Sequence, residues 1–182
     1  MNNPNSPFVN LEDKLNRIFV DKDVLLRALC TSEEAAKRAG VTKNPEDNSR
    51  MAFIGEQVLR FLVMVHHFAQ GADLGDIMAG AWRWTGRERL AHAGRRLELG
   101  RYLLHEPGSV VDAEAYADGV AAIIAAAYCD GGMDAVADVV EAMQLWRKEL
   151  GSGDVMQDRV DQLLSDLDGD HLLRGKVRQG GE

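Results

Sequence analysis

The stretch that most constrains the fold spans residues 48–65, NSRMAFIGEQVLRFLVMV, a long apolar run that contains one carboxylate and one glycine. Its apolar residues recur every three or four positions, which predicts a helix buried in the middle of a domain. Ala52 and Glu56 are four residues apart and should stack on another face of this helix. Gly55 disfavours a helix by about 1 kcal/mol relative to Ala, so we expect another element or another chain to approach closely there. The predicted buried face comprises Met51, Ile54, Val58, Phe61, Leu62 and Val65.

The composition favours a single, mainly helical domain. A chain of 182 residues is long enough to bury roughly two thirds of its unfolded surface in one core. Aliphatic residues and Ala dominate, while Pro (4) and aromatic residues (6%) are scarce, which favours helices over a sandwich or barrel. We expect a flexible N-terminus at 1–10, the domain at 11–150, and a C-terminal helix and tail at 151–182.

Turn and capping residues divide the domain into helices. Asn10 and Asp21 are predicted N-caps, and Gly40 and the pair Gly131–Gly132 are predicted stops. The predicted helices cover 11–18, 21–30, 33–40, 48–65, 111–128 and 133–150. A further helix is expected at 154–167 and should dock either on its own core or on a partner protein. Its apolar side carries Met156, Val160, Leu163, Leu164 and Leu167.

The charge distribution restricts any contact with nucleic acid. The net charge of −8 gives no overall attraction to a polyanion, so such a contact must come from a local basic patch. Region 74–97 is the most basic part of the chain, although charged helix faces are usually only solvated. Trp82 and Trp84 lie in it two residues apart, so we expect one in the core and the other partly exposed. Its arginines are Arg83, Arg87, Arg89, Arg95 and Arg96.

The two cysteines and the lack of targeting signals indicate a reducing compartment. Cys30 and Cys129 lie in helix-like runs without metal-ligand spacing, which predicts buried free thiols. Residues 1–10 lack the apolar core of a secretory signal and the character of an organelle presequence. No apolar run reaches the roughly 20 residues of a membrane span. We therefore expect a soluble cytoplasmic or nuclear protein without a membrane partner.

Four stretches, in order, resemble the ribonuclease III family. Residues 48–59, NSRMAFIGEQVL, are similar to its signature NERLEFLGDAVL, and residues 116–132, YADGVAAIIAAAYCDGG, to its ADAFEAIIGAIYLDGG. Residues 90–104 are similar to its LAxxAxxLGLGxYLL, and residues 11–35 to its opening helices. The resemblance covers about 11–145. It implies an all-α, homodimeric, ribonuclease III-like endonuclease domain, in which a carboxylate cluster binds magnesium and hydrolyses double-stranded RNA.

The resemblance also implies a degenerate metal site. The family's four acidic positions fall on Ala52, Glu56, Asp118 and Ala121, so two ligand positions are lost. An earlier family Glu falls on Ser49. Glu56 replaces an Asp, and its extra methylene displaces the carboxylate in a site that needs sub-ångström placement. The resemblance therefore indicates an RNA-processing or RNA-associated protein that is catalytically inactive or impaired and has no cofactor.

An alternative is that the protein keeps a metal-dependent nuclease activity with fewer metal ligands. Glu56 and Asp118 would then share a weakly bound Mg²⁺ or Mn²⁺ in an endoribonuclease, because Mg²⁺ can sit on one or two carboxylates with several waters. In the simpler interpretation they are polar groups bonded to backbone or to an arginine. A mitochondrial ribosomal role, which the resemblance also brings in, is disfavoured by the acidic balance and the lack of a presequence.

The resemblance extends to partners. The family's dimer aromatic and signature glycine fall on Phe53 and Gly55, which predicts a homodimer; the alternative is that Phe53 belongs to the chain's own core. The family's basic KLR falls on residues 79–81, AGA, so RNA contact would depend on Arg83, Arg87 and Arg89. We expect no double-stranded-RNA-binding domain in 151–182, and hence weak affinity for RNA.

Overall fold

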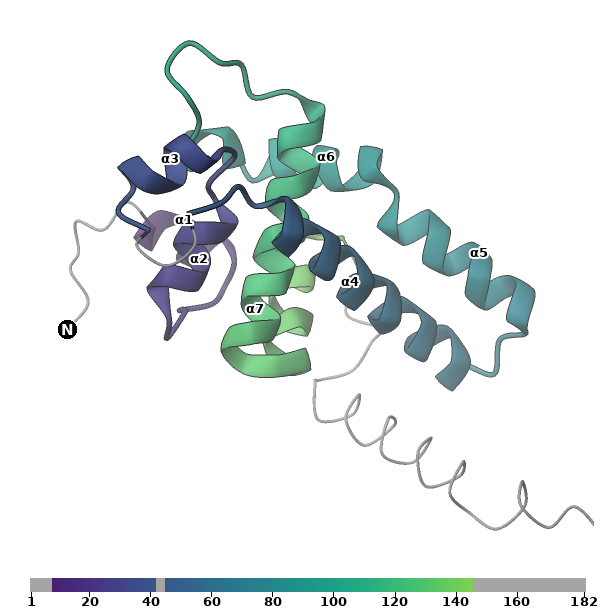
Figure 1. Ribbon diagram of the computed structural model, residues 1–182. Coiled ribbons are helices and arrows are strands. Elements are labelled where there is room, and N and C mark those ends of the chain that lie inside the picture. Colours follow the sequence, from purple (N-terminus) through teal and green to yellow (C-terminus); the bar gives the residue numbers. More distant parts are fainter. Residues whose placement is uncertain (1–7, 42–44, 146–182) are drawn as a thin grey trace, which may run out of the picture.

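The computed structural model describes residues 8–41 and 45–145, and within these ranges every extended regular element is a helix (Figure 1). The all-α prediction is confirmed, while the predicted helix at 154–167 lies outside the described residues. The helices are α1 (Val9–Lys14), α2 (Lys22–Ala28), α3 (Glu33–Arg38), α4 (Ser49–Ala69), α5 (Leu74–Thr85), α6 (Arg87–Arg96), the 3₁₀ turn η1 (Leu99–Arg101) and α7 (Ala113–Ala142).

Helix α7 forms the centre of the domain. It packs against α2, α4 and α6, and Figure 1 shows it between α1–α3 on one side and α4–α5 on the other. Its alanines leave room for the neighbouring helices to approach closely. By length and composition alone α7 is apolar enough to cross a membrane, but 56% of the relevant window is buried inside the domain. Its position as the core helix accounts for this apolar character.

Two glycines break α7 where the sequence predicts a stop. Gly132 has φ of 65°, and Gly131 also leaves helical geometry, after which the helix resumes to Ala142. Beside this kink the buried carboxylate of Asp130 accepts hydrogen bonds from the backbone N–H groups of Val20 and Asp21, both at 2.9 Å. Asp130 also pairs with Arg17 at 3.2 Å. The kink therefore anchors the α1–α2 connection to the core.

The buried face of α4 differs from the predicted one. Leu62 and Val65 are buried as expected, but Ile54 and Phe61 are 48% and 43% exposed. The pattern of large apolar residues misplaced the face because α4 meets α7 through its small side chains. Ala52, expected on another face, belongs to the buried side. The buried residues of α4 are Ala52, Gly55, Leu59, Leu62, Val63 and Val65.

Three smaller predictions also need correction. Helix α1 begins at Val9, inside the segment expected to be flexible, and its N-cap is Phe8 instead of Asn10. Cys30 is buried as predicted, whereas Cys129 is exposed, because it lies on the side of α7 that turns away from the core.

The predicted cap at Asp21 is confirmed, since its side chain accepts from the backbone N–H of Asp23. Trp82 is 67% exposed, while Trp84 packs partly buried against the core, as the spacing predicted.

Candidate functional site

A close crossing of α4 and α7 brings the two remaining family carboxylates together. A Cβ atom on Gly55 would lie 1.7 Å from the carbonyl oxygen of Ala121, so only glycine permits this crossing. Glu56 follows Gly55 on α4, and Asp118 lies one helical turn before Ala121 on α7. The backbone contact therefore fixes the two acidic side chains beside each other.

The guanidinium of Arg87 lies between these carboxylates. Its Nη1 donates to Glu56 Oε1 at 2.8 Å, and its Nη2 donates to Asp118 Oδ1 at 2.7 Å. A third acid, Glu114, accepts from Nη2 at 3.3 Å. Arg87 reaches this position because Gly86, with ψ of 133°, ends α5 and turns the chain before α6 begins. One cation thus joins α6 to both α4 and α7.

Electrostatics reinforce this arrangement. The hydrogen bond to Asp118, together with the negative charges of Asp118, Glu56 and Glu114, raises the pKa of Arg87 despite its partial desolvation. A cation at the first position of a helix is disfavoured by the helix dipole. The three carboxylates offset that penalty, since each charge-assisted hydrogen bond is stronger than a neutral one.

The residues present do not fit the divalent metal that the sequence resemblance implies. Ala52 and Ala121 are buried at 3% and 0% exposure and offer no ligand atom. Across 8–41 and 45–145, no group of three or more His, Cys, Asp or Glu side chains is arranged to hold a metal ion. The oxygens of Glu56 and Asp118 instead face the fixed positive charge of Arg87, which repels a second cation.

The three arginines predicted to contact RNA lie in different environments. Arg87 and Arg89 are two residues apart and project from nearly opposite sides of α6. Arg87 is committed to the carboxylates, whereas Arg89 stacks on Trp84, with its guanidinium carbon 3.8 Å from the ring centroid. Arg83 is exposed on α5. Of the three predicted RNA-contact arginines, Arg87 therefore lies at the acidic site, whereas Arg83 and Arg89 lie away from it.

The two residues predicted at a dimer interface, Phe53 and Gly55, also lie in different environments. Phe53 is 65% exposed and borders a largely apolar hollow of about 460 Å³ together with Met51, Ile54 and Cys129. Gly55 is buried against α7 of the same chain, so its close approach is made within the protomer and it does not face a partner. Of the two alternatives for Phe53, membership of the chain's own core is wrong.

Arg87 is the functional-site residue whose role sequence reasoning missed. The sequence allows Glu56 and Asp118 to bond to an arginine, but no motif identifies which one. One signal was available: the first turn of a helix normally favours acidic residues, so an arginine at the start of α6 indicates a carboxylate partner.

The fold and the site define an all-helical domain in which α4 and α7 bring an acidic pair together. A family model described as ribonuclease-III-like matches residues 21–147. Ribonuclease 3 of Caldanaerobacter subterraneus subsp. tengcongensis is 32% identical over 138 residues, covering 71% of this chain and 59% of that protein. Ribonuclease 3 of Solibacter usitatus is 35% identical over 136 residues, covering 69% and 50%. The match thus spans only half to three fifths of these curated relatives. The chain belongs to the ribonuclease-III-like family.

Solved structures agree with this assignment. Two structures of the nuclease domain of ribonuclease III from Campylobacter jejuni superpose with TM-scores of 0.63 and 0.62. Their identities are 22% and 24%, and the matches cover 75% and 76% of this chain and 96% and 95% of those chains. One of them concerns structural flexibility in a region involved in dimer formation of that nuclease domain. The predicted ribonuclease III-like fold is confirmed.

Proposed function

We propose that this protein acts in RNA processing or RNA-associated assembly and that its nuclease reaction is lost or strongly impaired. The observation that supports this proposal is the position of Arg87 between Glu56 and Asp118. A metal-dependent nuclease needs oxygen ligands that hold the ion and a metal-bound water that attacks the phosphate. Here a permanently protonated guanidinium takes up those oxygens, and it cannot deprotonate a water at neutral pH.

The alternative is an endoribonuclease that uses Glu56 and Asp118 with Mg²⁺ or Mn²⁺. For this, Arg87 would have to withdraw from two short ion pairs before the metal could enter. The ion would then have to bind with two of the four family ligand positions occupied by buried alanines. Both requirements raise the free energy of the metal-bound state, so the inactive state is the better supported proposal.

The test is a nuclease assay on the full chain with single- and double-stranded RNA in Mg²⁺ and in Mn²⁺. We expect no cleavage above that of RNA alone. Cleavage in Mn²⁺ that disappears in Glu56→Gln would refute the proposal and establish the alternative.

A companion measurement tests the role of Arg87 directly. We expect wild-type protein to leave the electron paramagnetic resonance signal of free Mn²⁺ unchanged, because Arg87 occupies the carboxylate oxygens of Glu56 and Asp118 that would face the ion. Arg87→Gln should bind Mn²⁺ more tightly than wild type, although weakly, since it frees Glu56 and Asp118, two carboxylates that could share one hydrated ion. Arg101→Gln is the matched control, because it removes one exposed arginine that pairs with Glu98 away from this site. Equal Mn²⁺ binding by Arg87→Gln and the control would contradict the proposed competition.

We also propose that the protein is a homodimer through the face around Phe53. Support comes from the exposure of Phe53 and Ile54 beside an apolar hollow, since contiguous exposed apolar surface usually marks an interaction site. Ala125 and Cys129 of α7 line the same hollow and extend this face. The C. jejuni domain, which has this fold, contains a region involved in dimer formation.

A further inference from the structure

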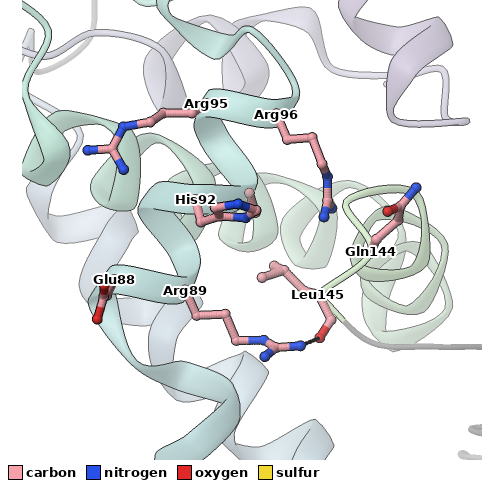
Figure 2. A pocket seen from close by; sticks show the side chains of 8 residues that line it. Glu88, Arg89, His92, Arg95, Arg96, Gln144 and Leu145 are labelled. Atoms are coloured by element: carbon pink, nitrogen blue, oxygen red, sulfur yellow. Dashed lines mark hydrogen bonds between the residues drawn. The ribbon is translucent and has the colours of Figure 1, made fainter.

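A polar cavity, separate from the apolar hollow beside Phe53, lies on α6 and faces the end of α7. It has a volume of about 500 Å³, within the range of small-molecule sites. Arg89, His92 and Arg96 line it from α6, and Gln144 and Leu145 line it from the segment that follows α7. Figure 2 shows Arg89 and Arg96 reaching across towards that segment, with His92 between them. The cavity is distinct from the Arg87 site, which is on the other side of α6.

Backbone carbonyls hold the two guanidiniums in place without neutralising them. Arg89 Nη2 donates to the carbonyl oxygen of Leu145 at 3.3 Å, and Arg96 Nη2 donates to that of Met143. Stacking on Trp84 fixes the plane of Arg89 further. The Nε–H of Arg89 is buried and has no hydrogen-bond partner. An unsatisfied buried donor is unfavourable by itself, and this one belongs to a cation that lines a cavity.

Within residues 8–41 and 45–145, the two arginines of the cavity have no carboxylate partner. Arg17, Arg87 and Arg101 each pair with a carboxylate, but in the described part of the chain no carboxylate lies within 4.0 Å of Arg89 or Arg96. Burial, followed by the positive charges of Arg96 and Arg83, lowers the pKa of Arg89. Glu88, on the rim, forms no ion pair with either arginine. Like charges are therefore held together in a chain whose net charge is −8.

We propose that this cavity is a binding site for a phosphate group, held by Arg89 and Arg96 with additional hydrogen bonds from His92 and Gln144. A guanidinium fork matches phosphate oxygens, and a bound anion relieves the repulsion between the two arginines. One guanidinium can satisfy a carboxylate through two parallel hydrogen bonds. A tetrahedral phosphate accepts hydrogen bonds from several directions, and the side chains of this cavity donate from several directions. The phosphate belongs either to a free mononucleotide or to the backbone of a nucleic acid. This site does not depend on whether nuclease activity is lost.

The first experiment observes wild-type full-length protein by NMR of the arginine Nε–H groups. The probes are inorganic phosphate, adenosine monophosphate, and one short single-stranded RNA prepared with a 5′-phosphate and with a 5′-hydroxyl. We expect saturable shifts of the Arg89 Nε–H resonance, because a phosphate bound to the Nη groups changes the charge and hydrogen bonding around this guanidinium. Binding of inorganic phosphate and the mononucleotide identifies a free phosphate, whereas equal binding of both RNAs without the small probes identifies the backbone. If no probe shifts this resonance at low ionic strength, the proposal is wrong.

Variants assign the binding to the cavity. Arg96→Gln should weaken the affinity for the probe that binds best by about tenfold or more, since it removes one charge-assisted contact. Arg101→Gln removes the same charge from an exposed position and should bind like wild type. Circular dichroism confirms that both are folded. Unchanged affinity in folded Arg96→Gln would overturn the assignment, and the wild-type NMR titration decides the matter if that variant does not fold.

Discussion

The close crossing of α4 and α7 makes Gly55→Ala the most direct test of the packing. The added Cβ would lie 1.7 Å from the carbonyl oxygen of Ala121, half of the 3.4 Å at which ordinary contact begins. It would also lie 2.6 Å from the carbonyl carbon of Ala121 and 3.1 Å from the backbone nitrogen of Ala125. These are atoms of a helix backbone, which cannot rotate away as a side chain can. Two helices of the core would have to separate.

The magnitude follows from two opposing effects. Overpacking a core usually destabilises by about 1–3 kcal/mol, and a clash with backbone belongs at the upper end or beyond it. Replacing a helical Gly by Ala returns about 1 kcal/mol of helix propensity. We therefore expect Gly55→Ala to lower the free energy of unfolding by about 2 kcal/mol or more, measured by urea denaturation with circular dichroism.

A matched control separates packing from propensity. Gly75 is exposed in the first turn of α5, where an added Cβ would meet only the Asp73 side chain, at 3.2 Å. Gly75→Ala should leave stability unchanged or raise it by up to about 1 kcal/mol. A Gly55→Ala protein as stable as the Gly75→Ala protein would refute the described crossing.

Three further predictions concern the surface and the thiols. Phe53→Asp should give a monomer by light scattering, because it places a charge on the apolar face. Phe68→Asp, at another exposed position farther along α4 (52% against 65% for Phe53), should not; an unchanged mass of the Phe53 variant would exclude this interface. Cys129 should react with a thiol reagent faster in the Phe53→Asp monomer than in wild type, and equal rates would also speak against the interface. Burial raises the pKa of Cys30 from 9.0 to about 11, so the neutral thiol favours the folded state. Stability at low protein concentration should therefore decline as pH rises from about 9 through about 11, and Cys30→Ala, compared by the same denaturation assay, should lose that part of the decline.

The sequence predicted the fold well where a few adjacent residues determine the local structure, as at helix caps and glycine turns. Asp21 caps α2, and Gly131 and Gly132 interrupt α7, because capping and left-handed backbone are properties of a few adjacent residues. The buried face of α4 was harder to predict. Large apolar side chains normally mark the buried side, but here Gly55 approaches the backbone of α7, Ala52 is buried on the same helix, and Ile54 and Phe61 remain partly exposed.

The candidate site was predictable only in part, for a similar reason. The order of the motifs predicted that Glu56 and Asp118 share a site, because the family resemblance assigns both to one carboxylate cluster. It could not place Arg87, because the direction of that side chain follows from the turn at Gly86 and from the orientation of α6 against two other helices. Arg87 and Arg89, which are close in sequence, were therefore both predicted to contact RNA. In the structure Arg87 pairs with carboxylates and Arg89 stacks on Trp84.

The Asp130 contacts also determine when the first helices become part of the domain. Val20 and Asp21 are hydrogen-bonded to a residue 110 and 109 positions further along the chain. Contacts so distant in sequence form only after the intervening chain has been brought together, and loop-closure entropy opposes them until then. During synthesis α1 and α2 are made before α7, and Asp130 follows them by more than one hundred residues. The connection between α1 and α2 therefore gains these hydrogen bonds only after the kink in α7 has been made.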